Sequence, residues 1–114
     1  FCRKVGSKLV YAGSSTKFGD GGLGRSQSPY AWTKATNTEL VKNYGEWFNV
    51  SYAITYFYNV YGPREIQIGK YATLIALFKE KMKNSEPLTI VSPGTQKRNF
   101  THIDDIINGL ILVG

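Results

Sequence analysis

Two apolar segments flank one long helical segment, and this order constrains the fold more than any other feature. Leu9–Ala12 is a continuous apolar run that ends at Gly13, and residues 50–59 are rich in Val, Ile, Thr, Tyr and Phe. Continuous apolar runs are typical of buried parallel strands. Between them, Ser28 and Pro29 provide an N-cap and a first-turn proline for a helix over about residues 30–48. A strand, a helix and a second strand predict an α/β fold with parallel pairing.

The remainder of the chain continues the same alternation. Helical spacing of apolar residues predicts a helix over residues 71–82, Leu88–Val91 predicts a short strand, and residues 98–103 predict a short extended segment. Asp104 and Asp105 are expected to cap a last helix over residues 106–113. These elements amount to part of a doubly wound parallel sheet, whose edges would be open. The chain also begins without Met, so we expect it to be a piece of a longer protein.

Composition and charge narrow the classes of function. The 114 residues are 42% hydrophobic, with one cysteine, Cys2, and no apolar run long enough for a membrane span or a signal peptide. We therefore expect a cytoplasmic protein that binds no membrane. The net charge of +6 raises the possibility of nucleic-acid binding, but the one lysine cluster, residues 79–83, is interrupted by Glu80. We expect a solvated face there, no nucleic-acid partner, and a small anionic ligand.

Tyr30 and Lys34 form a candidate acid–base pair. They are four residues apart, which makes them neighbours on one helix face. A lysine ammonium beside a phenol favours the phenolate, which can take a proton from an alcohol. Ser14 and Thr16 come after the first predicted strand, at the sheet edge where ligands bind in α/β proteins. Because the chain has 8 Tyr, the pair alone is weak evidence.

Two further patterns limit what this segment can bind by itself. The glycines at positions 19, 21, 22 and 24 do not match the Gly-x-Gly-x-x-Gly spacing of a dinucleotide loop, and no strand directly precedes them. No cluster of metal ligands is evident, so we expect no metal site.

Four segments in order carry a family resemblance and cover nearly the whole chain: LVYAGSSTKFGD (9–20), SPYAWTK (28–34), YFYNVYGPR (56–64) and GTQKRNFTHIDD (94–105). Together they resemble the extended short-chain dehydrogenase/reductase family, and more narrowly its NAD-dependent sugar-nucleotide epimerases and dehydratases. The resemblance implies a partial Rossmann-type fold with part of a small substrate-binding subdomain, and NAD as cofactor. It places the catalytic half of the NAD-binding domain at residues 1–64 and part of the substrate-binding region at residues 65–114.

The resemblance implies a role for each matching residue. Tyr30 would be the catalytic base, Lys34 would favour its ionised form and hold the nicotinamide ribose, and Ser14 would hydrogen-bond the sugar hydroxyl that is oxidised. Tyr58 would line the nicotinamide pocket. The substrate-binding residues would be Ser14, Thr16, Asn59 and Arg98, with Arg98 on the nucleotide diphosphate.

Residues outside these roles are interpreted as structural. His102 matches no catalytic position of the family, and Asp105 matches a helix-capping one.

The two residues after Ser14 suggest the subtype. Dehydratases that resemble this chain carry an Asp-Glu pair where Ser15 and Thr16 stand, and neither hydroxyl is a general acid or base at neutral pH. This favours a 4-epimerase, with a 4,6-dehydratase or reductase of the same family, or a truncated non-catalytic fragment, as alternatives. The loop from Ser14 to Tyr30 is shorter and richer in glycine than is usual for the family, which leaves the sugar open. By family analogy we expect a homodimer, and we expect the isolated segment to be inactive because the upstream glycine motif is not in it.

Overall fold

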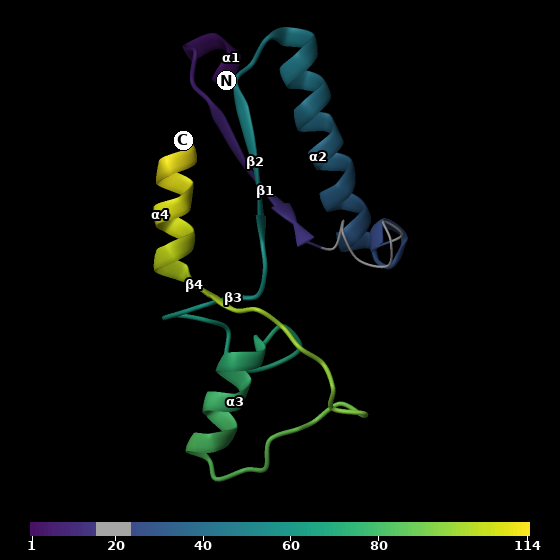
Figure 1. Ribbon diagram of the computed structural model, residues 1–114, viewed down its shortest axis with the longest axis vertical. Coiled ribbons are helices and arrows are strands. Elements are labelled where there is room, and N and C mark those ends of the chain that lie inside the picture. Colours follow the sequence, from purple (N-terminus) through teal and green to yellow (C-terminus); the bar gives the residue numbers. More distant parts are fainter. Residues whose placement is uncertain (16–23) are drawn as a thin grey trace. The chain divides into compact units, whose positions relative to one another are not determined.

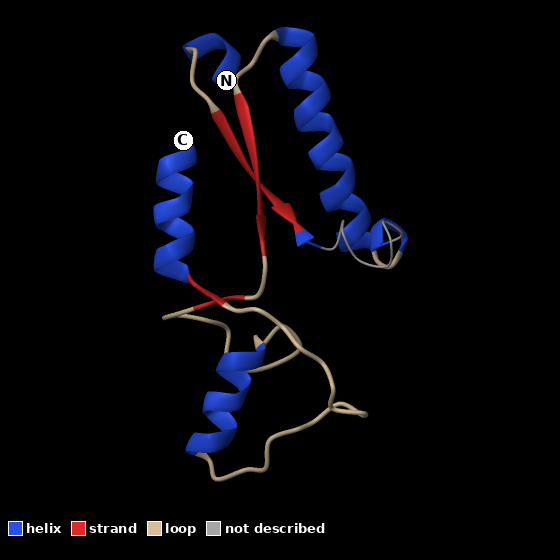
Figure 2. Ribbon diagram, in the orientation of Figure 1, coloured by secondary structure: helices blue, strands red, loops and turns tan. Residues whose placement is uncertain are grey.

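The computed structural model describes residues 1–15 and 24–114 (Figures 1 and 2). Contacts divide the chain into two compact units, and each is described by itself. The first unit comprises residues 1–58 and 107–114, and the second comprises residues 59–106.

A parallel strand pair forms the centre of the first unit. The elements are α1 (Cys2–Val5), β1 (Leu9–Ser14), α2 (Pro29–Phe48), β2 (Tyr52–Phe57) and the end of α4 (Ile103–Val113). β1 pairs in parallel with β2, from Leu9 opposite Tyr52 to Ser14 opposite Phe57. The parallel pairing predicted from the two apolar segments is thus confirmed, with α2 as the connection between them.

Small residues form the buried face of α2. Ala31, Ala35, Thr38 and Gly45 are its buried residues, and their spacing of three, four and seven places them on one side of the helix. Small side chains allow the helix backbone to approach the strands closely. The start of the helix is the predicted one, because Ser28 Oγ accepts a hydrogen bond from the Ala31 N–H at 3.1 Å and Pro29 is the first helical residue. It ends at Asn49, whose φ of 51° is left-handed.

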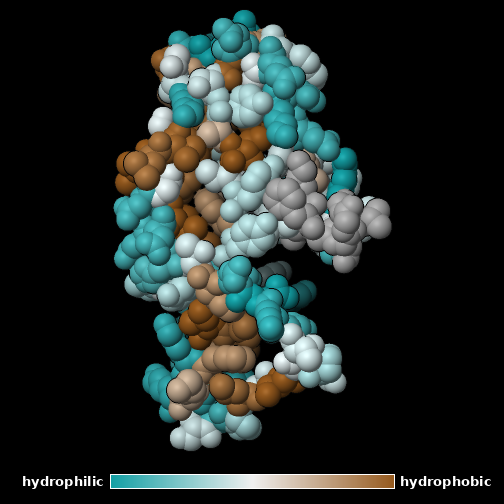
Figure 3. All heavy atoms as spheres, viewed as in Figure 1, coloured by the Kyte–Doolittle hydropathy of each residue, from teal (hydrophilic) through white to brown (hydrophobic). Residues whose placement is uncertain are grey.

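The end of α4 lies on the other side of the strand pair from α2 (Figure 1). The Lys8 ammonium, just before β1, donates to the carbonyl of Val113. Ile111 and Leu112 on α4 are 71% and 88% exposed, and Figure 3 shows apolar residues at the surface in this region. Such exposure is typical of a surface that packs against further protein. No helix in the described part of the chain is long and apolar enough to cross a membrane.

A shorter parallel pair lies in the second unit. β3 (Val60–Tyr61) pairs with β4 (Thr101–His102), so that Val60 is opposite Thr101. The same unit holds α3 (Leu74–Lys83), whose one buried residue is Ala76 at 2% exposure. This pairing brings the segment after β2 beside the segment before α4.

One predicted strand in this part of the chain was wrong, and both predicted helices are present but begin at other residues. Leu88–Val91 forms no strand: Ile90 is 78% exposed, and no described strand pairs with the segment. The helix expected over residues 71–82 begins at Leu74, which leaves Tyr71 outside it. The last helix begins at Ile103, so Asp104 and Asp105 lie in its first turn and do not cap it. Carboxylates are favourable there because they interact with the positive end of the helix dipole.

The close packing of α2 on β2 predicts a large effect of one methyl group. A Cβ at Gly45 would lie 2.2 Å from Tyr52 Cδ1 and 3.1 Å from the Val50 carbonyl oxygen. We therefore expect Gly45→Ala to lower the free energy of unfolding by about 1–3 kcal/mol, the usual cost of overpacking. Urea denaturation of the purified protein measures this.

Gly109→Ala is the matched control, because Gly109 lies within α4 and a Cβ there meets no atom within 4 Å. Alanine is the better helix former, so this variant should gain roughly 0.5–1 kcal/mol. Equal stability of Gly45→Ala and the natural protein would contradict the close approach of α2 and β2.

Candidate active site

The end of β1 carries Ser14 and the start of α2 carries Tyr30 and Lys34, and these two ends lie near one another (Figure 1). Ser14 is the half-buried last residue of β1, Tyr30 is the second residue of α2, and Lys34 lies one turn later. Tyr30 directly precedes the buried Ala31, and Lys34 directly precedes the buried Ala35. Both side chains therefore lie beside the buried face of the helix. Tyr30 is 58% exposed, which leaves its ring accessible to a ligand.

Lys34 is held by the strand at its ammonium end. Its Nζ donates to the carbonyl oxygen of Ala12 at 3.0 Å and lies 5.5 Å from the centre of the Tyr11 ring. At the backbone end, the hydroxyl of the buried Thr38 donates to the Lys34 carbonyl at 2.8 Å. The position of the half-buried lysine is therefore defined at both ends.

Local contacts define where the turn that carries Tyr30 begins. Besides the Ser28 cap, Thr33 Oγ1 donates to the Pro29 carbonyl at 2.7 Å. Arg25 forms an ion pair with Glu39 at 3.0 Å, which joins the segment before the helix to its third turn. Both side chains of this pair are about half exposed, so we assign it little stabilisation.

Tyr58 and Thr16 are the two remaining residues predicted near this site. Tyr58 lies just after β2 in the same unit and is 47% exposed. Thr16 lies outside the described residues.

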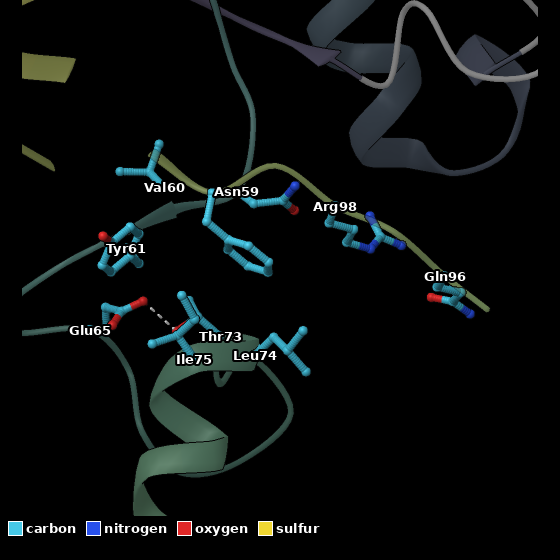
Figure 4. A pocket seen from close by; sticks show the side chains of 10 residues that line it. Asn59, Val60, Tyr61, Glu65, Thr73, Leu74, Ile75, Gln96 and Arg98 are labelled. Carbon is cyan, nitrogen blue, oxygen red and sulfur yellow. Dashed lines mark hydrogen bonds between the residues drawn. The ribbon is translucent and has the colours of Figure 1, made fainter. Parts of the chain in front are cut away.

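The second unit contains a cavity of about 420 Å³ that brings Asn59 and Arg98 together (Figure 4). This volume is in the range of small-molecule sites. Asn59 lies directly before β3, and its Nδ2 donates to the Asn99 carbonyl at 2.9 Å. Arg98 lies in the segment that leads into β4. The β3–β4 pairing is what makes two residues so distant in sequence line one cavity.

Sequence reasoning missed the opposite wall of this cavity. Glu65 accepts a hydrogen bond from Thr73 Oγ1 at 2.7 Å (Figure 4), and Leu74 and Ile75 open α3 beside them. Thr73 holds the N-cap position of α3 but makes no side-chain cap, because its hydroxyl is used by Glu65. No sequence signal pointed to this wall, because Thr73 lies inside the helix predicted over residues 71–82. The cavity combines the Arg98 guanidinium, side-chain amides and the Glu65 carboxylate with apolar side chains.

His102 contacts two neighbouring residues of the second unit, Asp104 and Tyr61. Its Nδ1 accepts the Asp104 N–H at 3.3 Å and is 3.4 Å from Asp104 Oδ2, while its ring meets Tyr61 edge-on at 5.2 Å. The described residues include no group of three or more His, Cys, Asp or Glu side chains that could hold a metal ion.

Comparison with known proteins identifies the family. The "NAD dependent epimerase/dehydratase family" matches residues 1–114. The chain belongs to this family.

One curated relative and two solved structures are similar to this epimerase/dehydratase chain. It is 33% identical over 112 residues to the "Uncharacterized UDP-glucose epimerase YtcB" of Bacillus subtilis, which covers 92% of the chain and 34% of the relative. The UDP-N-acetylglucosamine 4-epimerase of Methanobrevibacter ruminantium, in complex with UDP-N-acetylmuramic acid, superimposes with a TM-score of 0.85 at 28% identity, over 98% of the chain and 39% of that structure.

The second structure is the UDP-glucuronic acid 4-epimerase of Bacillus cereus, in complex with UDP-glucuronic acid and NAD. It has a TM-score of 0.79 and 30% identity, over 96% of the chain and 36% of that structure. These superpositions confirm the predicted partial Rossmann-type α/β fold. The chain spans about a third of the length of the curated relatives it matches.

Proposed function

We propose that this chain carries the catalytic and substrate-binding residues of an NAD-dependent 4-epimerase of nucleotide-activated sugars. One observation carries the proposal: Tyr30 and Lys34 occupy successive turns at the start of α2, and the Lys34 ammonium is held on β1 at Ala12, two residues before Ser14. This arrangement supports a site in which the Tyr30 base, the Lys34 cation and the Ser14 hydroxyl act together at the carboxyl end of β1. Membership of the epimerase/dehydratase family supports the reaction class.

In this proposal Tyr30 is the base. Its phenolate takes the proton of the sugar 4-hydroxyl while the C4 hydride leaves, and it returns the proton when the hydride comes back to the opposite face of the 4-keto sugar. Ser14 donates a hydrogen bond to the same sugar oxygen and keeps it beside the phenolate. Lys34 stabilises the phenolate electrostatically.

The residues of the first unit suit the nicotinamide half of NAD. An ammonium has three N–H donors, and Ala12 accepts one from Lys34, so two are left for the Tyr30 oxygen and the ribose hydroxyls. Tyr58 provides an exposed aromatic ring after β2 for the nicotinamide. NAD, when bound, accepts the hydride from sugar C4 and gives it back.

Substrate binding is assigned to the cavity of the second unit and to Thr16. Arg98 would bind the diphosphate, because a guanidinium offers paired donors to phosphate oxygens. Asn59 would contact the diphosphate or the sugar, and both residues line the same cavity. We keep the assignment of catalysis to residues 1–64 and of substrate binding to residues 65–114 as part of this proposal.

Tyr30→Phe in the natural full-length protein tests the base. The change removes the hydroxyl and keeps the ring, so we expect kcat to fall by roughly 10²–10⁴-fold, as for loss of a general base. The dissociation constant of the sugar nucleotide should stay within about twofold, since the diphosphate contacts are untouched. The assay is turnover of UDP-glucose, with binding followed by calorimetry.

Tyr44→Phe is the matched control: it makes the same change on the same helix, at a half-exposed tyrosine that stacks on Phe48. It should keep full turnover. Normal turnover by Tyr30→Phe would end the epimerase proposal.

A 4,6-dehydratase is the alternative within the same family. Ser15 stands next to Ser14 where those enzymes carry an acid, which favours epimerisation because no carboxyl is available there to eliminate water. The mass of the product decides between the two reactions. An epimerase returns a sugar nucleotide of unchanged mass, whereas a product lighter by one water would replace our proposal with the dehydratase.

We also propose that the full-length protein is a cytoplasmic homodimer. One cysteine in 114 residues suits a reducing compartment. The outer face of α2 exposes Trp32 and Trp47, at 54% and 67%, and large aromatic residues are enriched at protein interfaces. Native mass spectrometry of the full-length protein should give twice the protomer mass, and a monomer at working concentration would remove this part.

A further inference from the structure

We propose that Tyr11 is a positioning residue for Lys34: its aromatic ring holds the ammonium beside the Tyr30 hydroxyl from the strand side. This inference rests on the proposed function, because it assigns to Lys34 the role described above. It adds a residue whose effect on turnover passes through the lysine.

The Lys34 ammonium needs contacts that fix its position, because the lysine side chain is long and flexible. A four-carbon stem with free rotation lets an ammonium turn outward to water. In the structure Lys34 Nζ lies 5.5 Å from the Tyr11 ring centre, within the distance at which a cation is attracted to an aromatic face. The Ala12 carbonyl, at 3.0 Å, is the neighbouring contact. One strand thus holds the ammonium by two adjacent residues.

The ring itself is held in place by the sheet. Tyr11 is opposite Ile54 in the β1–β2 register, and its carbonyl accepts a hydrogen bond from Thr55 Oγ1 at 3.3 Å. Residues alternate between the two faces of a strand, so the Tyr11 ring faces α2 while its neighbours face away. The ring is therefore a fixed part of the surface onto which the lysine folds.

The ring, and not the hydroxyl, is the part that meets Lys34. The Tyr11 hydroxyl is buried and has no hydrogen-bond partner among the described residues. It forms no bond to the ammonium. Phenylalanine, which keeps the ring, should therefore serve as well as tyrosine, whereas leucine keeps apolar volume and loses the attraction for a cation.

The experiment compares Tyr11→Leu with Tyr11→Phe in the full-length protein. We expect Tyr11→Leu to lower kcat about tenfold with little change in KM for the sugar nucleotide, and Tyr11→Phe to keep kcat within about twofold. In a Lys34→Met background, Tyr11→Leu should lower kcat by no further factor, because residues that act through one group are not additive. Unchanged turnover in Tyr11→Leu, equal losses in both variants, or a full additional loss in the Lys34→Met background would overturn the inference.

Tyr52→Leu controls for loss of an aromatic residue from the same sheet. Tyr52 is half-buried on β2, opposite Leu9 at the other end of the strand pair. It should lose stability as Tyr11→Leu does, measured by thermal unfolding, but keep kcat. Tyr30→Phe in the same assay separates the two proposals: if it is active, the proposed function fails, and if it is inactive while Tyr11→Leu is normal, only the role of Tyr11 fails.

Discussion

The approach of α2 to the strand pair is the constraint on which the site depends. Ala31, Ala35, Thr38 and Gly45 are the buried residues of α2, and their small side chains let the helix backbone lie close to the strands. Larger residues on that face would move the helix outward, and the Lys34 ammonium would no longer reach the Ala12 carbonyl. A lysine side chain spans only a few ångströms of separation between elements, so the small residues that define the packing also define the geometry of the proposed site.

This packing explains why the functional residues lie beside the buried face and not in it. Ala31 and Ala35 are buried. Tyr30 lies one residue before Ala31, and Lys34 lies one residue before Ala35. A rotation of one residue about a helix places a side chain at the edge of the contact. There, Tyr30 remains exposed to a ligand while Lys34 folds against the strand. The same helical period thus separates the residues that pack from those proposed to react.

The parts of the fold that could be predicted from the sequence depend on local signals. Ser28 and Pro29 identify the start of α2, and the two apolar segments identify β1 and β2. The family motifs drew attention to Asn59 and Arg98, which share one cavity. The roles proposed for all these residues stay predictions.

The errors share a cause: the outcome depended on a partner distant in the sequence. The strand β3 has two residues, too few for any periodic pattern, and exists because it pairs with β4, which lies within the predicted extended segment 98–103. Leu88–Val91 has the composition of a strand, but no described strand pairs with it. The helix α3 begins at Leu74 and not at residue 71, and Thr73 before it bonds Glu65, eight residues earlier in the chain.

Several residues of β1 contribute to the proposed site, and they lie within four positions of one another. Tyr11 presents a ring to Lys34, Ala12 accepts its ammonium N–H, and Ser14 ends the strand at the proposed sugar site. Since the pleat of a strand fixes the direction of successive side chains and carbonyls, the lysine and the serine are placed relative to one another by the same backbone. That backbone is in turn bonded to β2 along its whole length. A site built on such a paired strand loses little conformational entropy when a ligand binds, so the proposed proton transfer would need little rearrangement of this strand.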